Sequence, residues 1–281
     1  MLRRAMMAQG AAPPVGYLDD LSVQPSAVLS LRKLISTATT AIRVRRSSDD
    51  AEQDIGFTGD ALDTASLATF VGSDSAHVTT VYDQSGNGED AVQATAANQP
   101  RIVNAGTYDG KLVFDGTNDF MKVTALAQGS QYGAIYSKIQ LANSGSFEIV
   151  FETGTTGAST AGSMSMYVNN SGSGWSMAMG NTDGGTSAIY PVASIVALTQ
   201  LTALYDRSTS GADEIKFYRA GTNIAPSSSV LQNQSGNLAA LDLYIGARAG
   251  TSLFAGVFME TAVFYNVDTA AIRASIEAIV A

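Results

Sequence analysis

The sequence predicts an all-β fold, a sandwich of two sheets built from many short strands. The 281-residue chain holds 27 glycines, 45% hydrophobic residues and only 15% charged residues, a composition typical of folded chains with tight turns. Short runs rich in β-branched and aromatic residues alternate with clusters of Gly, Asn, Asp and Ser, as an all-β sandwich requires. The length fits one main domain, residues 25–281, after an N-terminal segment, residues 1–24.

The N-terminal segment, residues 1–24, is predicted to be an extended arm. It has two arginines, three methionines and two prolines without a sustained period. Two interpretations stay open: a frayed terminus, and an arm that orders only against a neighbouring subunit. Gln9 and Gly10 interrupt its apolar part, so we expect no signal peptide. No run approaches the roughly 18 apolar residues that a membrane span needs, so membrane insertion is not expected.

The start of the main domain predicts a helix followed by a strand. Apolar residues recur at helical spacing over residues 26–36, which predicts a short amphipathic helix. Residues 42–45 then alternate apolar and basic side chains, as in a half-buried strand. We expect the arginines of this region to pair with the acidic cluster at residues 49–54, in preference to forming a binding patch.

Two further helices and a succession of strands complete the secondary structure. Residues 63–71 are predicted to be helical, with Gly72 as the C-terminal glycine, and apolar spacing predicts a third helix at residues 269–280. Between them lie strand-like runs at residues 78–82, 101–103, 111–114, 120–123, 147–152, 163–168, 175–179, 195–205, 214–219, 241–245 and 256–265.

The stretch VTTVYDQSGNGEDA, residues 78–91, is a strand that runs into a polar turn. Polar residues alternate ahead of Gly88 as in the first half of an EF-hand calcium loop, but the twelfth position is Ala94 and not glutamate. We therefore interpret the turn as structural, with side chains that fix its backbone. Its motif residues are Tyr82, Asp83, Asn87 and Gly88.

Charge and composition exclude several classes of function. Sixteen basic against twenty-five acidic residues give a net charge of −9, which repels phosphate backbones, so nucleic acid is not an expected partner. The chain has no cysteine, and His77 is its only histidine. Thiolate and multi-histidine metal sites are thereby excluded, and we expect neither a metal nor a cofactor.

A resemblance to a known family covers residues 29–123. The segments AIRVRRSSDDAEQDIGF, LDTASLATFVG, VTTVYDQSGNGEDAVQATAANQPRIV and KLVFDGTNDFM resemble the catalytic domain of α-L-arabinofuranosidase B, and YDQSGNG is the most specific part. Phage and prophage virion proteins that carry the same block are more similar still. The ending LYIGARAGTSLFAGVFMETAVFYN resembles concanavalin A-like and laminin G-like sandwiches. The resemblance implies a two-sheet jelly roll with glycan-binding loops.

The same resemblance implies two catalytic carboxylates that this chain lacks at the matching positions. A glutamate is implied after the tryptophan-bearing middle strands, where the segment holds only Asp183. An aspartate is implied in the loop after the late Ile-Gly, where this chain has Arg248. Because glycosidases normally need a pair of carboxylates, we expect no enzyme activity and assign no catalytic residue.

Sugar binding depends on other groups, since aromatic faces contact sugar rings and amides or carboxylates bind hydroxyls. Polar and aromatic residues in or beside the Gly-rich loops could supply these groups, although for Trp175 a core position is favoured over a binding role. The glycan-binding candidates are Trp175, Tyr167, Tyr190, Asn169, Asn181 and Asp183.

The sequence therefore favours a non-enzymatic virion structural protein of a tailed phage, as a capsid decoration, head fibre, or tail and receptor-binding component. The expected location is the particle surface. The expected partners are other virion proteins, contacted through residues 1–24, with a host-surface glycan as a further candidate ligand. We expect a homo-oligomer, with a trimer as one form considered. The alternative is an arabinofuranosidase-type glycoside hydrolase with relocated carboxylates.

Overall fold

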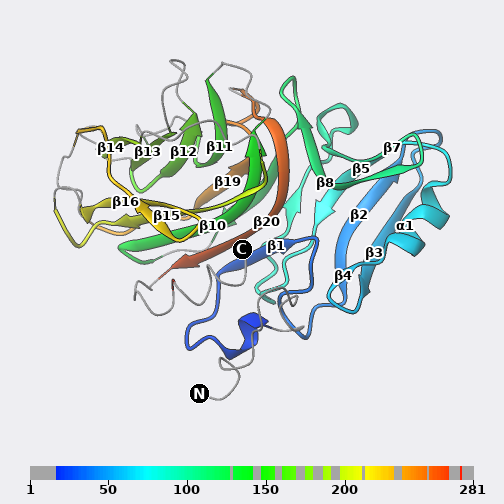
Figure 1. Ribbon diagram of the computed structural model, residues 1–281, viewed down its shortest axis with the longest axis horizontal. Coiled ribbons are helices and arrows are strands. Elements are labelled where there is room, and N and C mark those ends of the chain that lie inside the picture. Colours follow the sequence, from blue (N-terminus) through cyan, green and yellow to red (C-terminus); the bar gives the residue numbers. More distant parts are fainter. Residues whose placement is uncertain are drawn as a thin grey trace.

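The computed structural model describes residues 17–126, 129–141, 147–155, 160–168, 175–179, 186–190, 197–210, 213–230, 236–251, 253–265 and 273. It shows a β-sandwich joined on one side to a smaller β-lobe that carries the α-helix (Figure 1). Every strand pairing is antiparallel among these residues. The predicted all-β sandwich class is confirmed.

The first sheet of the sandwich is organised around its longest strand, β20. This strand pairs along one edge with β10, while its other edge pairs with β8 at its start and with β1 near its end. The strands follow in the order β1 (Ala27–Ser30), β20 (Ala255–Tyr265), β10 (Tyr132–Leu141), β15 (Thr199–Asp206), β16 (Ile215–Arg219) and β17 (Thr222–Ile224).

The second sheet of the sandwich has β19 and β11 near its middle. Its strands follow in the order β6 (Ala91–Val92), β9 (Met121–Leu126), β19 (Leu241–Ile245), β11 (Glu148–Thr153), β12 (Met164–Val168), β13 (Trp175–Met179), β14 (Thr186–Tyr190) and β18 (Ser228–Val230). All six residues of β11 are buried, so this strand passes through the centre of the domain.

The β-lobe continues from β8 away from the sandwich (Figure 1). Helix α1 lies against β3, and a 3₁₀ helix, Ala96–Asn98, precedes β7. The lobe contains β8 (Thr107–Asp115), β7 (Arg101–Asn104), β5 (Ala76–Val81), β2 (Thr40–Arg46), β3 (Glu52–Thr58), β4 (Ala61–Leu62) and α1 (Thr64–Val71).

Helix α1 confirms the prediction for residues 63–71. The Asp63 carboxylate accepts a hydrogen bond from the Ser66 backbone N–H at 3.0 Å, which satisfies one of the donors left open at a helix start. Gly72 follows the helix with a positive φ of 62°, a conformation that glycine adopts without steric cost. Leu67 and Val71 are buried in the lobe.

A single cluster of buried hydrophobic side chains runs from the lobe into the sandwich. It includes Ile42 and Val78 in the lobe and Leu112, Phe151 and Val263 at the junction and between the two sheets. Burial of each such side chain contributes roughly 1.5–3 kcal/mol relative to exposure. The two parts therefore share one hydrophobic core.

The predicted helix at residues 26–36 is wrong. Residues 27–30 form strand β1, which pairs with β20, and the apolar residues at helical spacing divide between two clusters. Val28 and Leu34 pack on the outer side of the first sheet with Leu18, whereas Leu31 belongs to the main core. Pairing with β20 supplies hydrogen bonds that a helix would have made internally, so tertiary contacts override the local spacing.

The DQSGNG turn holds this segment in place. The Asp83 carboxylate accepts hydrogen bonds from the N–H of Val28 at 2.8 Å and of Ser85 at 2.9 Å. The amide of Asn87 donates to the Ser26 carbonyl at 3.0 Å. The contacts with Val28 and Ser26 span more than 50 residues of sequence, so the turn attaches the first strand of the sandwich to the lobe.

Gln84 completes the attachment from a buried position. Its Oε1 accepts from the N–H of Leu34 at 2.8 Å, and its Nε2 donates to the carbonyls of Ser30 at 3.1 Å and Arg32 at 2.7 Å. The side chain thus satisfies backbone groups in a segment that is neither helix nor strand after residue 30, as buried backbone groups require.

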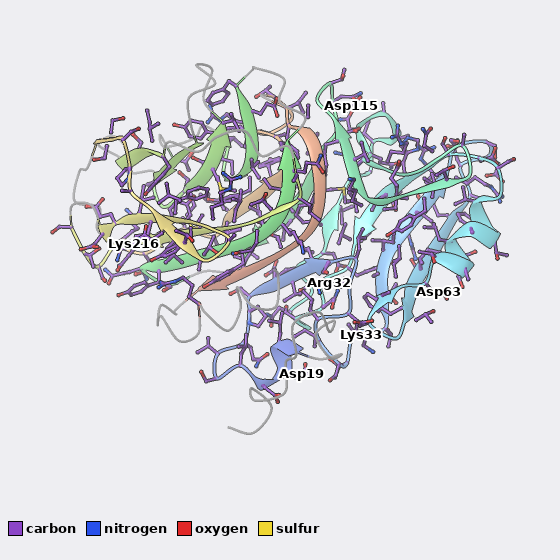
Figure 2. The ribbon with its side chains drawn as sticks, in the orientation of Figure 1. Asp19, Arg32, Lys33, Asp63, Asp115 and Lys216 are labelled. Carbon is purple, nitrogen blue, oxygen red and sulfur yellow. The ribbon has the colours of Figure 1, made fainter. Side chains whose placement is uncertain are left out.

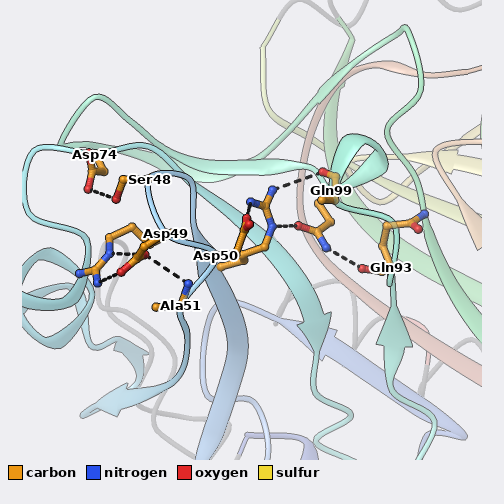
Figure 3. A network of polar contacts seen from close by, with 10 residues as sticks. Ser48, Asp49, Asp50, Ala51, Asp74, Gln93 and Gln99 are labelled. Carbon is orange, nitrogen blue, oxygen red and sulfur yellow. Dashed lines mark hydrogen bonds and ion pairs between the residues drawn. The ribbon is translucent and has the colours of Figure 1, made fainter.

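The arginines of β2 form the expected ion pairs with the acidic cluster. Arg43 pairs with Asp54, Arg45 with Asp50 and Arg46 with Asp49, at 2.7, 2.7 and 2.6 Å. Figure 3 shows the part of this network around Asp49 and Asp50, which extends through Gln99 to the Gln93 carbonyl at 3.0 Å. The basic residues are therefore neutralised locally, and this confirms the ion-pair interpretation over a binding patch.

Described residues near both ends of the chain, Leu18 and Arg273, contact the outer side of the first sheet. Part of the predicted arm is ordered there: Tyr17–Asp20 forms a 3₁₀ helix, Leu18 is fully buried, and Asp19 lies beside it at the lower edge of the molecule (Figure 2). The predicted helix at residues 269–280 lies outside the described residues except for Arg273, whose guanidinium stands 4.3 Å from the Tyr218 ring centroid. Within the described chain, no helix has the length and apolarity to cross a bilayer.

Candidate functional site

A row of polar side chains crosses the second sheet on the side facing away from the core. Strand register aligns Lys122 of β9, Tyr244 of β19, Glu152 of β11 and Ser165 of β12 as neighbours. Paired residues project from the same face of a sheet, whereas their sequence neighbours, such as Phe151, belong to the hydrophobic core. The alternation of strand side chains thus creates a polar face opposite the core.

The loop after β19, residues 246–251, covers this row. Gly246 starts the loop with a φ of +84°, and a Cβ there would meet the Phe114 ring at 2.7 Å, so only glycine fits. Arg248 and Thr251 pair through two backbone hydrogen bonds of 2.7 and 2.8 Å, and the Thr251 hydroxyl donates to the Arg248 carbonyl at 2.8 Å. The loop is therefore a closed turn that fixes the backbone of Arg248.

Arg248 forms an ion pair with Glu152 from the strand beneath. Arg248 Nε lies 3.0 Å from Oε1 and 2.9 Å from Oε2 of Glu152, and Nη2 lies 2.8 Å from Oε2. The Glu152 side chain is fully buried, while that of Arg248 is 27% exposed. A buried carboxylate requires such a partner, because an isolated buried charge costs several kcal/mol.

Aromatic rings flank the ion pair. The Arg248 guanidinium stands 5.5 Å from the centroid of the Phe147 ring, within the range of a cation–π contact. Phe147 in turn lies 5.0 Å from the Tyr167 ring at an interplanar angle of 42°. Both rings are partly exposed, so they present apolar surface next to the arginine, a combination suited to a sugar ring and its polar substituents.

Ser165 adds a buried hydroxyl beside Glu152. Within the described part of the chain, its Oγ has no hydrogen-bond partner, although the residue is 1% exposed. Buried hydroxyls normally have a partner, so such an atom marks a place where a water or a ligand group belongs. The polar face therefore combines a carboxylate and a hydroxyl in one row with the guanidinium that the loop places against them.

Further carboxylates lie at the turn between β8 and β9, next to the covering loop. Asp115 lies at the tip of this turn (Figure 2), and its N–H donates to Asp119 at 3.0 Å. Burial raises the pKa of the Asp119 carboxyl to about 7, and the neighbouring Asp115 charge adds to the effect. Glu148 accepts from the Ala255 N–H at 3.1 Å. These acids support the backbone around the site.

The structure places the two glycan-binding candidates whose side chains it describes, Tyr167 and Tyr190, in different environments. Tyr167 lies on the polar face beside Phe147. Tyr190 is buried in the core, where its hydroxyl donates to the Ile215 carbonyl at 2.8 Å and burial raises its pKa above the ordinary value. Trp175 begins β13, paired with Val168 and Tyr190, but its side chain is outside the described set. Asn169, Asn181 and Asp183 also lie outside the described residues.

Tyr82, like the other motif residues of the DQSGNG turn, lies in the β-lobe. Its hydroxyl donates to Asp54 at 2.8 Å, and burial together with this carboxylate raises its pKa to about 12. The described ranges contain no group of three or more His, Asp or Glu side chains arranged to hold a metal ion.

Sequence reasoning missed Glu152 and Phe147 and gave Arg248 no binding role. One signal was present: Glu148 and Glu152 interrupt the otherwise apolar run FEIVFET, and a carboxylate inside a buried strand must find a partner. The identity of that partner, 96 residues away, depends on strand order and could not be read from spacing.

Comparisons with known proteins agree on one fold. The model of the catalytic domain of α-L-arabinofuranosidase B matches residues 26–135. A solved GH54 α-L-arabinofuranosidase is 17% identical, with a TM-score of 0.60, over 91% of this chain and 62% of the other. An arabinofuranosidase complexed with arabinofuranosyl-α-1,2-xylobiose is 18% identical, with a TM-score of 0.59, over 95% and 64%. No curated protein matches the sequence.

These comparisons show that the fold is similar to that of the arabinofuranosidase B catalytic domain. The chain spans less than two thirds of the length of these solved enzymes. The expectation of a non-enzymatic phage structural protein is corrected, because the matching family and the similar structures are glycoside hydrolases. Oligomeric state and an attachment role for residues 1–24 stay predictions.

Proposed function

We propose that this chain is a glycoside hydrolase of the arabinofuranosidase type, which removes α-L-arabinofuranosyl residues from an oligosaccharide. The observation that carries the proposal is the family match over residues 26–135, which includes the β-lobe with its DQSGNG turn as well as the first sandwich strands. The fold similarity then extends over 91% to 95% of the chain. One of the similar structures holds an arabinofuranosyl oligosaccharide, which indicates the substrate class.

The chemistry requires two carboxylates, one to protonate the leaving oxygen and one to act as nucleophile or base. Glu152 is the carboxylate on the polar face, and its ion pair with Arg248 suits the second role. The residue proposed for the first role is Asp183, in the segment between Met179 and Thr186. These flanking residues pair with each other, and Met179 pairs with Met164, one residue along β12 from the Glu152 row.

Arg248 is the main departure from the arrangement that the resemblance implies, since an aspartate is implied in its loop. With the arginine there, the acid must come from another segment, which is why the proposal assigns it to Asp183. The ion pair also shields Glu152 from solvent. Of the two carboxylate oxygens, Oε2 contacts both Nε and Nη2 of Arg248, whereas Oε1 contacts only Nε, so Glu152 reacts through Oε1 and keeps its Oε2 contact with Arg248.

Hydrolysis of 4-nitrophenyl α-L-arabinofuranoside tests the proposal directly. The expected result is turnover above the blank for the natural chain and a loss of at least a hundredfold in kcat for Asp183→Asn and for Glu152→Gln, since general acid–base catalysis contributes about 10²–10⁴-fold. Matched controls are Asp213→Asn, at an exposed ion pair with Lys216, and Glu52→Gln, at an exposed position of β3. Thermal melting verifies that each variant is folded. Absence of turnover by the natural chain contradicts the proposal.

A further inference from the structure

The guanidinium of Arg248 is held by one edge only. Its Nε and Nη2 atoms contact the Glu152 carboxylate at 2.8 to 3.0 Å. A guanidinium carries five N–H donors, and a second edge, formed by Nη1 and Nη2, matches another planar carboxylate. Among the described residues, Nη1 has no hydrogen-bond partner. The side chain is 27% exposed, so this second edge can face a ligand.

The position of this edge is fixed from three sides. The buried Glu152 carboxylate sets the plane of the guanidinium, the Phe147 ring lies 5.5 Å from its centre, and the backbone pair with Thr251 fixes the loop. An arginine held in this way loses little conformational entropy on binding, and preorganisation of this kind favours affinity. An exposed arginine without these contacts would adopt many rotamers and would lose more conformational entropy on binding.

The charges at the site nearly cancel, so the arrangement of hydrogen-bond donors, and not net charge, determines which ligand is recognised. Glu152 offsets the charge of Arg248, and the whole chain carries a net charge of −9. Long-range attraction of anions is therefore weak here. Two parallel hydrogen bonds from a planar fork discriminate a carboxylate from a single hydroxyl even when the net charge is small. The rings of Phe147 and Tyr167 supply apolar contact beside that fork.

We propose that Arg248 binds the carboxylate of an acidic sugar through its Nη1–Nη2 edge, so that the substrates are arabinofuranosyl oligosaccharides that also carry a uronic acid residue. This inference rests on the proposed hydrolase function and names the substrate class of the same site. Glu152 orients the arginine, and Phe147 and Tyr167 contact the sugar rings. Arg248 binds the carboxylate. The residue that sequence reasoning treated as a lost catalytic acid thereby becomes the residue that determines specificity.

The test compares two ligands that differ in one group. A non-hydrolysable S-linked arabinofuranosyl oligosaccharide with one glucuronic acid residue and the same compound after reduction of its carboxyl group to an alcohol are titrated calorimetrically into the full chain. The expected result is an affinity about tenfold higher for the acidic ligand, the size of one additional charge-assisted hydrogen bond. Arg248→Lys keeps a positive charge next to Glu152 but has no fork, so the preference should disappear. The matched control Arg219→Lys, on β16 of the other sheet, should retain it.

The outcomes separate this inference from the proposed function. Equal affinity for the two ligands, a preference that survives Arg248→Lys, or no binding of either ligand overturns the inference. Turnover of the neutral 4-nitrophenyl α-L-arabinofuranoside is measured with the same preparations. Turnover without acid preference leaves the hydrolase function intact and removes only the inference. Acid preference lost in Arg248→Lys but without any turnover supports the carboxylate site and contradicts the hydrolase function.

Discussion

The turn at residues 83–90 and the loop at residues 246–251 are both held by a side-chain carboxylate, but the partners differ. Asp83 accepts hydrogen bonds from backbone groups of its own turn and of β1. Glu152 instead holds an arginine side chain that keeps part of its donor capacity exposed. The first arrangement is complete within the fold, whereas the second leaves a group for a ligand. The prominent DQSGNG motif thus stabilises the fold, whereas the inconspicuous Gly-Ala-Arg segment at residues 246–248 belongs to the candidate site.

Among the substitutions that test this comparison, Gln84→Ala is expected to have the largest effect on stability. The substitution removes hydrogen bonds to the backbone at residues 30, 32, 34 and 35 and should lower the free energy of unfolding by about 3–4 kcal/mol, because each buried group left unsatisfied costs about 1–3 kcal/mol and water reaches some of them. Urea unfolding measures the change. Gln53→Ala, at an exposed position of β3, is the control and should change stability by less than about 0.5 kcal/mol. A loss below 1 kcal/mol for Gln84→Ala would mean that the turn does not fasten β1.

Arg248→Met should destabilise the chain by about 2–3 kcal/mol. The change leaves the fully buried Glu152 without its cation, and breaking a buried pair by removing one partner costs about 3–5 kcal/mol, reduced here because Arg248 is partly exposed. The double variant Glu152→Gln with Arg248→Met should recover part of the loss, which a double-mutant cycle in urea detects. If the two single changes add without coupling, the ion pair does not stabilise the loop.

The two loops show which features of the structure could be predicted from the sequence. Strand alternation at residues 42–45, the capped helix after Asp63 and the all-β class follow from local patterns, and the structure confirms them. The helix predicted at residues 26–36 is wrong, because the hydrogen bonds of this segment come from β20 and Gln84. The pairing of Glu152 with Arg248 depends on β19 lying next to β11, and no local pattern encodes that neighbour relation.

Asp119 provides a pH test of the turn beside the site loop. Its pKa is raised to about 7 in the folded chain, against about 3.9 when unfolded. Well below pH 4 both states hold the proton, so the group adds nothing to the pH dependence of stability there. Between pH 4 and 7 the unfolded state loses its proton first, so stability falls as pH rises. We expect a fall of about 2 kcal/mol, allowing for relaxation of the turn on ionisation. The measurement is urea unfolding at pH 4, 5.5 and 7.5.

Asp119→Asn should flatten this pH dependence while keeping an acceptor for the Asp115 N–H. Asp109→Asn, which removes an ion pair with Arg101 in the lobe, is the control, and its pH profile should keep the slope that Asp119 produces. A slope that persists in Asp119→Asn places its origin in another group and contradicts the assignment.

The smallest effects concern residues with positive φ, and they have opposite signs in the two loops. Gly88 in the DQSGNG turn has a φ of +79°, so Gly88→Ala should lower stability by about 1 kcal/mol, the cost of a left-handed conformation for an L-residue. Ala249 beside Arg248 already has a φ of +46° and bears that strain, so Ala249→Gly should raise stability by up to about 1 kcal/mol. Thermal melting of both variants measures the pair of changes.

Because Ala249→Gly also loosens the loop that positions Arg248, affinity for the acidic ligand should fall slightly as stability rises. If the variant gains stability and affinity together, the strain at Ala249 has no part in presenting the arginine.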